Sequence, residues 1–187
     1  FARRKSRITE QIKKQADAIN GQVVIAEDLL DEVTSLNEWP VALTGRFEER
    51  FLTVPAEALV STMKSNQKYF HILDEHQQMM PYFITIANLE SKDPRHVIEG
   101  NERVIRPRLE DAAFFFATDQ KKTLEDRLDS LKPVVFQKQL GSLHDKSVRV
   151  GQLAAKIAGS IGGNSDWAQR AGQLCKADLM TEMVKEW

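Results

Sequence analysis

Two neighbouring stretches rich in aromatic and β-branched residues constrain the fold of this chain more than any other feature. They run from Lys68 to Leu73 (KYFHIL) and from Met80 to Asn88 (MPYFITIAN), with the polar residues DEHQQ between them. Such residues favour strands, and a polar connection of this length is typical of an antiparallel hairpin. The chain is therefore expected to contain an antiparallel sheet.

Helical patterns precede this hairpin. Apolar residues recur at spacings of three and four between Arg3 and Asn20, and again over Asp28–Leu36. After Pro40, VALTGRF alternates as a strand does, and FLTVP is a candidate continuation of that strand. Pro55 then opens another helical stretch. Helices and strands thus alternate in the first part of the chain.

The pattern after the hairpin is helical. Asp93 and Pro94 are the expected N-cap and first residue of a helix that Pro107 should kink or break. Three later stretches also predict helix: Leu124–Leu131, Gly141–Ile161 and Ser165–Trp187. We therefore expect an α+β fold class, with an α+β module over residues 1–120 followed by an all-helical segment over residues 121–187.

Composition narrows the functional classes. The 187 residues are 42% hydrophobic with a formal net charge of -1, so a nucleic-acid contact would need a local basic patch. The longest apolar runs are far too short to cross a bilayer. Cys175 is the only cysteine, which excludes an internal disulfide, fits a reducing cytoplasm and suggests a buried thiol. The start at Phe1 without a methionine indicates a piece of a longer protein.

An arginine cluster within NERVIRPR is the first candidate binding feature. Arg103, Arg106 and Arg108 lie close together, and planar guanidinium groups suit phosphate or carboxylate recognition. Arg106 also precedes Glu110 by four residues, so an internal ion-pair network on a solvated helix face explains the same pattern. Both interpretations stay open at this point.

Two further motifs carry competing interpretations. In NQKYF, Gln67 and Lys68 could contact phosphate or sugar, while Asn66 could equally cap a helix with Tyr69 and Phe70 alternating between surface and core. The run Phe114–Phe116 could stack on bases, but three adjacent phenylalanines on a helix are better explained as core residues.

No complete active site is visible. His144 and Asp145 form a His-Asp dipeptide that raises a metal-dependent phosphohydrolase, yet the other three histidines lie in the α+β part. His144 is better explained as a surface residue near a helix start, where Asp145 favours the helix N-terminus. Glycine-rich phosphate loops and the common hydrolase motifs are absent.

Three stretches resemble one known family. They are LLDEVTSLNEWPVAL, then NQKYF through PYFITIANLESKDPRHVIEGNERVIRPRLEDAAFFF, and finally FQKQLGSLHDKSVRV with CKADLMTEMV. In this order they are similar to the beta subunit of bacterial two-subunit glycyl-tRNA synthetase. The resemblance implies an internal fragment with a module like the B3/B4 domain, then a degenerate HD-like domain, in which Ala177 stands where a histidine would precede Asp178.

The resemblance also implies a function. It implies an α2β2 ligase of translation that attaches glycine to tRNA(Gly) in the cytoplasm, with ATP and Mg²⁺ bound by the alpha subunit and no cofactor or catalytic residue in this fragment. The fragment would support tRNA binding and assembly with the alpha subunit. Alternatives are an HD-type phosphohydrolase, a purely structural scaffold and, with no supporting residue set, editing of mischarged tRNA. The tRNA-binding candidates are Lys64, Lys68, Arg103, Arg106 and Arg108.

Overall fold

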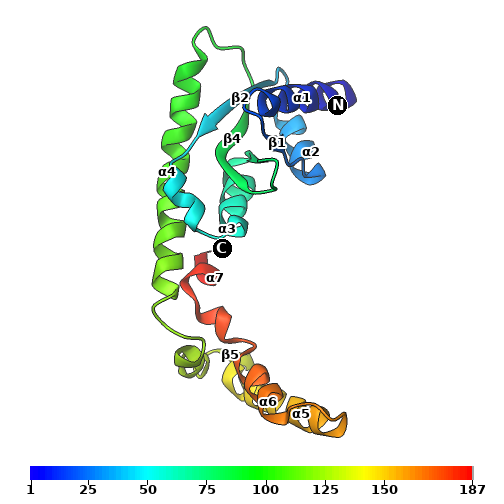
Figure 1. Ribbon diagram of the computed structural model, residues 1–187, viewed down its shortest axis with the longest axis vertical. Coiled ribbons are helices and arrows are strands. Elements are labelled where there is room, and N and C mark those ends of the chain that lie inside the picture. The colour runs from blue at the N-terminus through cyan, green and yellow to red at the C-terminus, as the bar shows by residue number, and fades with distance from the viewer. Residues whose placement is uncertain (187) are drawn as a thin grey trace. The chain divides into compact units, whose positions relative to one another are not determined.

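Strand pairing between distant residues builds the first of two structural units, Phe1–Ala113, and the second unit begins at Phe114 (Figure 1). The computed structural model describes residues 1–186. The elements of the first unit are α1 (Ala2–Asp17), β1 (Gln22–Val23), α2 (Glu27–Leu36), β2 (Val41–Arg46), the 3-10 helix η1 (Glu49–Thr53), α3 (Ala56–Ser61), the π-helical segment η2 (Thr62–Asn66), β3 (Phe70–Leu73), β4 (Met79–Ala87) and the part of α4 (Pro94–Asp119) that precedes Phe114.

The four strands form one antiparallel sheet in the order β1-β3-β4-β2. The predicted hairpin is confirmed as β3 and β4, and its turn is held by Asp74, whose carboxylate accepts the backbone N–H groups of His76 and Gln78 at 2.9 and 2.8 Å. The strand predicted after Pro40 is confirmed as β2, which pairs with β4 along its whole length. The α+β fold class therefore holds for this unit.

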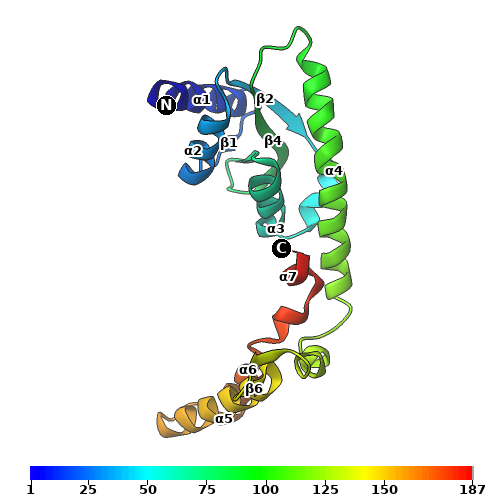
Figure 2. The same ribbon diagram turned by 180° about the vertical axis from the view of Figure 1, so that it is seen from behind.

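Both faces of the sheet are covered. Helices α1 and α2 lie on one side and α4 lies on the other, as both ribbon views show (Figures 1 and 2). The core on the α1 and α2 side consists of Ile8, Ile12, Ala16, Leu29, Leu30, Val33, Ala42, Phe70, Ile72 and Ile84. Successive strand residues point to opposite faces, so Phe83, next to Ile84, points the other way and stacks on Tyr69 with ring centroids 4.4 Å apart. Gly45 leaves room for it, since a Cβ there would lie 2.4 Å from the Phe83 ring.

Helix α4 is continuous, so of the kink or break expected at Pro107 the break is wrong. A proline inside a helix removes one hydrogen bond and costs ~3 kcal/mol or more. Burial of Ile105, Leu109 and Ala112 on one side of α4 offsets that cost. The start of α4 follows the prediction, because the Asp93 carboxylate accepts the Arg95 N–H at 3.1 Å.

The predicted strand FLTVP is also wrong, because these residues form η1 and its C-terminal cap. The N–H of Phe51 donates to the Glu48 carbonyl at 3.1 Å, and that of Val54 donates to the Phe51 carbonyl at 3.0 Å. Because these local bonds satisfy the backbone, the segment needs no strand partner, and the side chains of Phe51 and Val54 are buried.

The second unit was predicted to be all-helical, but it also contains two short strands. Its elements are the end of α4, the 3-10 helix η3 (Glu125–Leu131), β5 (Val135–Gln137), β6 (Gly141–Ser142), α5 (Leu143–Ser160), α6 (Ser165–Leu174), the 3-10 helix η4 (Ala177–Met180) and α7 (Glu182–Glu186). Strands β5 and β6 form a small antiparallel hairpin, and its second strand begins at Gly141, which has a φ of 83°. Glycine adopts this conformation at no steric cost, so the helix expected from Gly141 begins only at Leu143.

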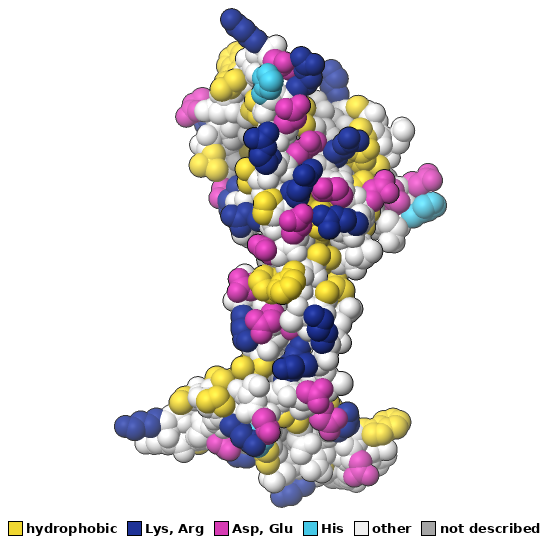
Figure 3. Space-filling view, turned by 90° about the vertical axis from the view of Figure 1, so that its left-hand side faces the viewer, with side chains coloured by type: hydrophobic (Ala, Val, Ile, Leu, Met, Phe, Trp, Pro, Cys, Tyr) yellow, Lys and Arg dark blue, Asp and Glu magenta, His cyan; other side chains and the backbone are white. Residues whose placement is uncertain are grey.

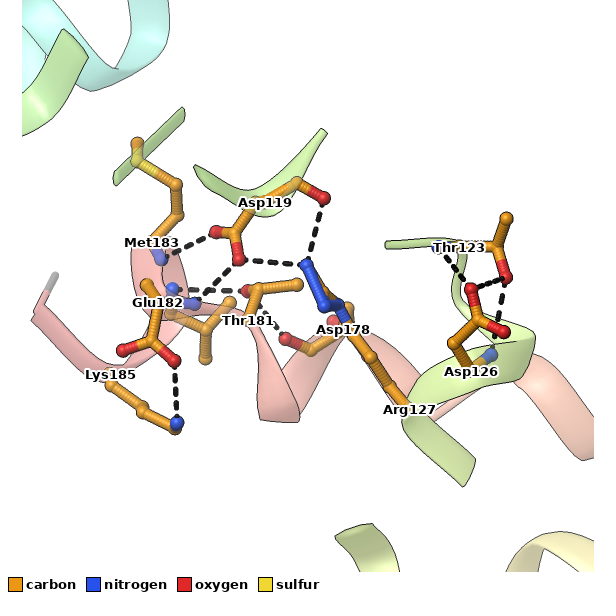
Figure 4. A network of polar contacts seen from close by, with 10 residues as sticks. Asp119, Thr123, Asp126, Arg127, Asp178, Thr181, Glu182, Met183 and Lys185 are labelled. Carbon is orange, nitrogen blue, oxygen red and sulfur yellow. Dashed lines mark hydrogen bonds and ion pairs between the residues drawn. The ribbon is translucent and has the colours of Figure 1, made fainter. Parts of the chain in front are cut away.

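The single helix expected over Ser165–Trp187 is wrong within the described residues, because it divides into α6, η4 and α7. Asp119 explains the separate start of α7. Its carboxylate accepts the N–H groups of Glu182 and Met183 at 2.9 and 2.8 Å, and it also pairs with the buried Arg127 at 2.9 Å (Figure 4). One carboxylate thus joins three segments of this unit.

The expectation that Phe114–Phe116 are core residues is wrong for Phe114, which is 63% exposed. Phe115 and Phe116 are half-buried. Adjacent helical residues point about 100° apart, and α4 is covered on one side, where Ile105, Leu109 and Ala112 lie. Of three adjacent phenylalanines on such a helix, at least one side chain must point toward solvent.

Candidate nucleic-acid interface

Two ion pairs connect helix α4 to the segment around η1. Nε of Arg106 lies 2.9 Å from Glu48, and Nη2 of Arg50 lies 2.9 Å from Glu110. The spacing of Arg106 and Glu110 suggested a pair within the helix, but each residue instead bonds a partner outside it. Arg106 therefore serves as a brace between α4 and η1.

Arg103 and Arg108 differ from Arg106, because both are exposed and neither forms an ion pair within residues 1–186. Five residues apart on a helix corresponds to about 140° of rotation. The two guanidinium groups therefore border one solvent-facing arc, which also carries the exposed residues Val104, Pro107 and Asp111. This arc is the candidate interface of α4.

Acidic side chains limit how far the positive charge extends. Figure 3 shows Lys and Arg side chains interleaved with Asp and Glu over the first unit, on the side where α4 lies. A hollow of about 350 Å³ beside Arg106 is lined by Arg46, Phe47, Glu48, Glu49, Pro81, Tyr82, Glu102 and Arg106. Its three carboxylates outnumber its two guanidinium groups, which disfavours phosphate in the hollow.

Lys64 and Lys68 are both paired with α2. Lys64 contacts Asp28 at 2.7 Å and Lys68 contacts Glu32 at 2.9 Å, so two lysines four residues apart match two acids four residues apart. The Lys64 ammonium is the main reason why the pKa of Asp28 lies below its ordinary value. Exposed pairs of this kind contribute little to stability, so their main effect is to compensate the lysine charges.

The alternation expected at Tyr69 and Phe70 puts neither residue on the surface. Both are buried, because they point to opposite faces of a sheet that is covered on both sides. The Tyr69 hydroxyl donates to Asn101 on α4 at 2.6 Å, and burial raises the pKa of Tyr69 to about 12. Asn66 is the last residue of η2, and the φ of 60° at Lys68 lets the chain turn into β3.

The His-Asp dipeptide belongs to the start of α5. Asp145 and Ser142 form a reciprocal capping box, and the Ser142 N–H and hydroxyl groups lower the pKa of Asp145. His144 lies in the first turn of α5, near the helix start as expected, and its side chain is partly exposed. Within residues 1–186, no group of three or more His, Cys, Asp or Glu side chains could hold a metal ion.

Two other sequence expectations have plain outcomes. Cys175 is exposed rather than buried, because it is the C-cap of α6, where its thiol contacts the Gly172 carbonyl at 3.0 Å. In the part of the chain that the structure describes, no helix is both long and apolar enough to cross a membrane.

Glu48 and Arg50 are the site residues that the sequence pattern did not indicate. Both lie in or beside a segment that was expected to be a strand, and they are about 60 positions from their partners on α4. The only available signal was their charge, opposite to that of Arg106 and Glu110.

Comparison with known proteins gives a consistent result. The family model described as "Glycyl-tRNA synthetase beta subunit" matches residues 1–187. The glycine–tRNA ligase beta subunits of Hahella chejuensis and Marinobacter nauticus are 65% and 61% identical to this chain, over all of it. That of Chromohalobacter salexigens is 58% identical over 99% of it. The chain spans 27% of the length of each relative. The chain belongs to the family of glycyl-tRNA synthetase beta subunits.

Proposed function

We propose that this chain is part of a glycine–tRNA ligase beta subunit and contributes tRNA-binding surface and folded support to it. The names of its relatives support this role, and none of them supports a phosphohydrolase. The whole enzyme would be an α2β2 assembly in which the alpha subunit binds ATP and Mg²⁺, while the beta subunit contacts tRNA(Gly). No catalytic residue is assigned to this part.

The observation that carries the proposal is the exposed arc of α4. Arg103 and Arg108 keep exposed guanidinium groups without an acidic partner among residues 1–186. Arginine binds phosphate through its planar fork of donors. Lys64, Lys68 and Arg106, the other candidates, are engaged in ion pairs. We therefore assign RNA contact to Arg103 and Arg108 and internal ion pairing to the other three.

Two double variants of the whole enzyme separate contact from bracing. Arg103→Ala/Arg108→Ala should weaken tRNA(Gly) binding and leave thermal stability unchanged. It should also lower the salt slope of log K by about 1.8, since each duplex phosphate contact contributes about 0.9. The matched control, Arg50→Ala/Arg106→Ala, removes the same charge from the same region, so it should change stability by no more than about 1 kcal/mol per exposed pair and spare RNA affinity.

The outcome decides between RNA contact and a purely structural role. Equal loss of affinity in both double variants would mean that only the general charge matters, and the arc would not be a site. Unchanged affinity in Arg103→Ala/Arg108→Ala would assign α4 to scaffolding, with tRNA held by other parts of the subunit.

We also propose that the first unit corresponds to the module like the B3/B4 domain and the second to a degenerate HD-like domain. The division of the chain at Phe114 supports two modules, with the boundary slightly before residue 120. Ala177 before Asp178, together with the role of Asp145 in a capping box, supports an HD-like domain without metal chemistry.

A further inference from the structure

The second unit exposes more large hydrophobic side chains than it buries. Among residues 114–186, the buried hydrophobic residues are Leu131, Ala158 and Ala177, and two of these three are alanines. Twelve large hydrophobic side chains of the same residues are exposed. A folded unit must bury apolar surface to offset the entropy of ordering its chain. The described residues of the second unit therefore supply only part of a core.

Four of these exposed side chains form a stripe along α5. They are Val150, Leu153, Ile157 and Ile161, the C-cap, which are 37%, 60%, 51% and 77% exposed. Their spacing of three, four and four residues places them on one side of the helix. Single exposed hydrophobic residues are ordinary on a protein surface, whereas a continuous set marks an interaction site. We call these four residues the α5 stripe.

A different side of α5 is covered by α6. The two helices lie side by side in both ribbon views, and a Cβ at Gly151 would lie 2.8 Å from the Gln169 carbonyl oxygen (Figures 1 and 2). Two residues along a helix correspond to about 200° of rotation, so Leu153 points away from α6. Helix α6 therefore leaves the α5 stripe uncovered.

Two cations border the α5 stripe. Arg149 and Lys156 are exposed and form no ion pair within residues 1–186. Around the helix they lie about 40° and 60° from Leu153, on the side away from the rest of the stripe. A helix packed on the stripe would meet apolar groups at its centre and these cations at its edge, where acidic residues would complement them. RNA could bind the two cations, but it would leave four aliphatic side chains without apolar contacts.

We propose that the α5 stripe is covered by an amphipathic helix with an acidic edge, which belongs to the same beta subunit and lies outside these 187 residues. The chain spans 27% of the length of its relatives, so 100% minus 27%, or about 73% of such a subunit, is available to supply this helix. A segment of the same chain is also present at high effective concentration. A second copy packed stripe to stripe would bring like charges together at Arg149 and Lys156. The inference goes beyond the proposed function and does not depend on the RNA contacts of α4.

Cysteine labelling in the complete ligase tests whether the α5 stripe is covered. Leu153→Cys and Ile157→Cys should each react with a water-soluble maleimide at least about tenfold more slowly than Gln152→Cys, because a covered thiol reacts only when the interface opens. Gln152 is the matched control, since it is exposed and lies about 100° from Leu153 on the same helix. Mass spectrometry of each labelled peptide measures the rates separately from that of the exposed Cys175.

Photo-cross-linking in the complete ligase identifies what covers the stripe. p-Benzoylphenylalanine is placed at Val150 and, in a second variant, at Ile161, so that one end of the stripe stays testable if the other variant fails to assemble. Each should cross-link to a peptide of the same beta subunit outside the matched part, and the product should keep the mass of one beta subunit on a denaturing gel.

Several outcomes would overturn the proposal. A cross-link to the alpha subunit, to tRNA or to a second beta subunit would assign the stripe to a different occupant. Labelling of Leu153→Cys and Ile157→Cys as fast as that of Gln152→Cys would show that the stripe is open to solvent. Equal protection of all three cysteines would show that coverage of α5 is not specific to the stripe.

Discussion

Replacement of Asp119 by alanine should selectively destabilise the second unit. The Asp119 carboxylate is 13% exposed and pairs with the Arg127 guanidinium, which is 7% exposed, at 2.9 Å. The same carboxylate accepts two backbone N–H groups at the start of α7. The substitution leaves a buried cation and two donors without their acceptor.

The magnitude follows from the burial of the pair. Removing one partner of a buried ion pair costs about 3–5 kcal/mol, because the remaining charge is uncompensated. Arg127 keeps one acceptor, the Asp119 carbonyl at 2.8 Å, while its Nε already lacks a partner. We therefore expect about 3 kcal/mol for Asp119→Ala, at the lower end of that range.

Hydrogen exchange read by mass spectrometry measures this loss unit by unit. A destabilisation of about 3 kcal/mol corresponds to roughly 10²-fold faster exchange of the globally protected amides. The faster exchange should appear in peptides from α5 and α6, while peptides from β3 and β4 in the first unit keep their protection. Asp166→Ala, at an exposed position in the first turn of α6, is the matched control and should change stability by about 0.5 kcal/mol or less.

A double variant tests the stated cause. Asp119→Ala/Arg127→Met removes both charges, so it should recover part of the stability lost in Asp119→Ala. If Asp119→Ala exchanges like Asp166→Ala, the carboxylate does not hold this unit together. If the double variant is clearly less stable than Asp119→Ala, the uncompensated charge of Arg127 is not the reason why Asp119→Ala loses stability.

Two further predictions concern packing and pH. A Cβ at Gly172 would lie 2.6 Å from Cα of Gly151, so Gly172→Ala should destabilise the α5–α6 pair by about 1–3 kcal/mol in urea unfolding. At Gly100 a Cβ meets nothing within 4 Å, so Gly100→Ala should instead stabilise α4 by about 0.5–1 kcal/mol. Equal effects of the two substitutions on the free energy of unfolding would contradict the packing argument. Burial lowers the pKa of His71, so as pH falls the unfolded state takes up this proton at a higher pH than the folded state does, and the stability of the first unit should fall as pH drops below the ordinary value of 6.5. His71→Gln should flatten that dependence of stability on pH. An NMR titration that places the His71 pKa at or above 6.5 would contradict the prediction.

Local patterns made the first unit largely predictable. The β3–β4 hairpin, β2, α1 and α2 were all expected, because alternation and helical periodicity reflect which face of each element is buried. Both strands of the hairpin also carried β-branched and aromatic residues on covered faces. When the apolar residues of a segment lie on one face of a single helix or strand, the sequence alone indicates both the element and its buried face.

Features that depend on distant partners could not be predicted in the same way. The segment FLTVP has the composition of a strand, yet it does not join the sheet and forms η1 through local hydrogen bonds. The close approach of Gly151 to Gly172 required knowing that α5 and α6 pack together. Phe114 was expected in the core because its neighbours in sequence are apolar, although exposure depends on which side of α4 is covered.

The arginines of NERVIRPR show why the same limit applies to function. From spacing alone, RNA contact and internal pairing each accounted for Arg103, Arg106 and Arg108, and the one pair that spacing suggested, Arg106 with Glu110, does not form. The tertiary fold distinguishes them, since Glu48 lies within reach of Arg106 and no acid pairs with Arg103 or Arg108 among residues 1–186. The charge of a paired arginine is largely compensated, whereas an unpaired one retains its full attraction for phosphate. Function in such a cluster is therefore decided by distant acids, and the two unpaired arginines are the positions at which RNA affinity should respond to mutation.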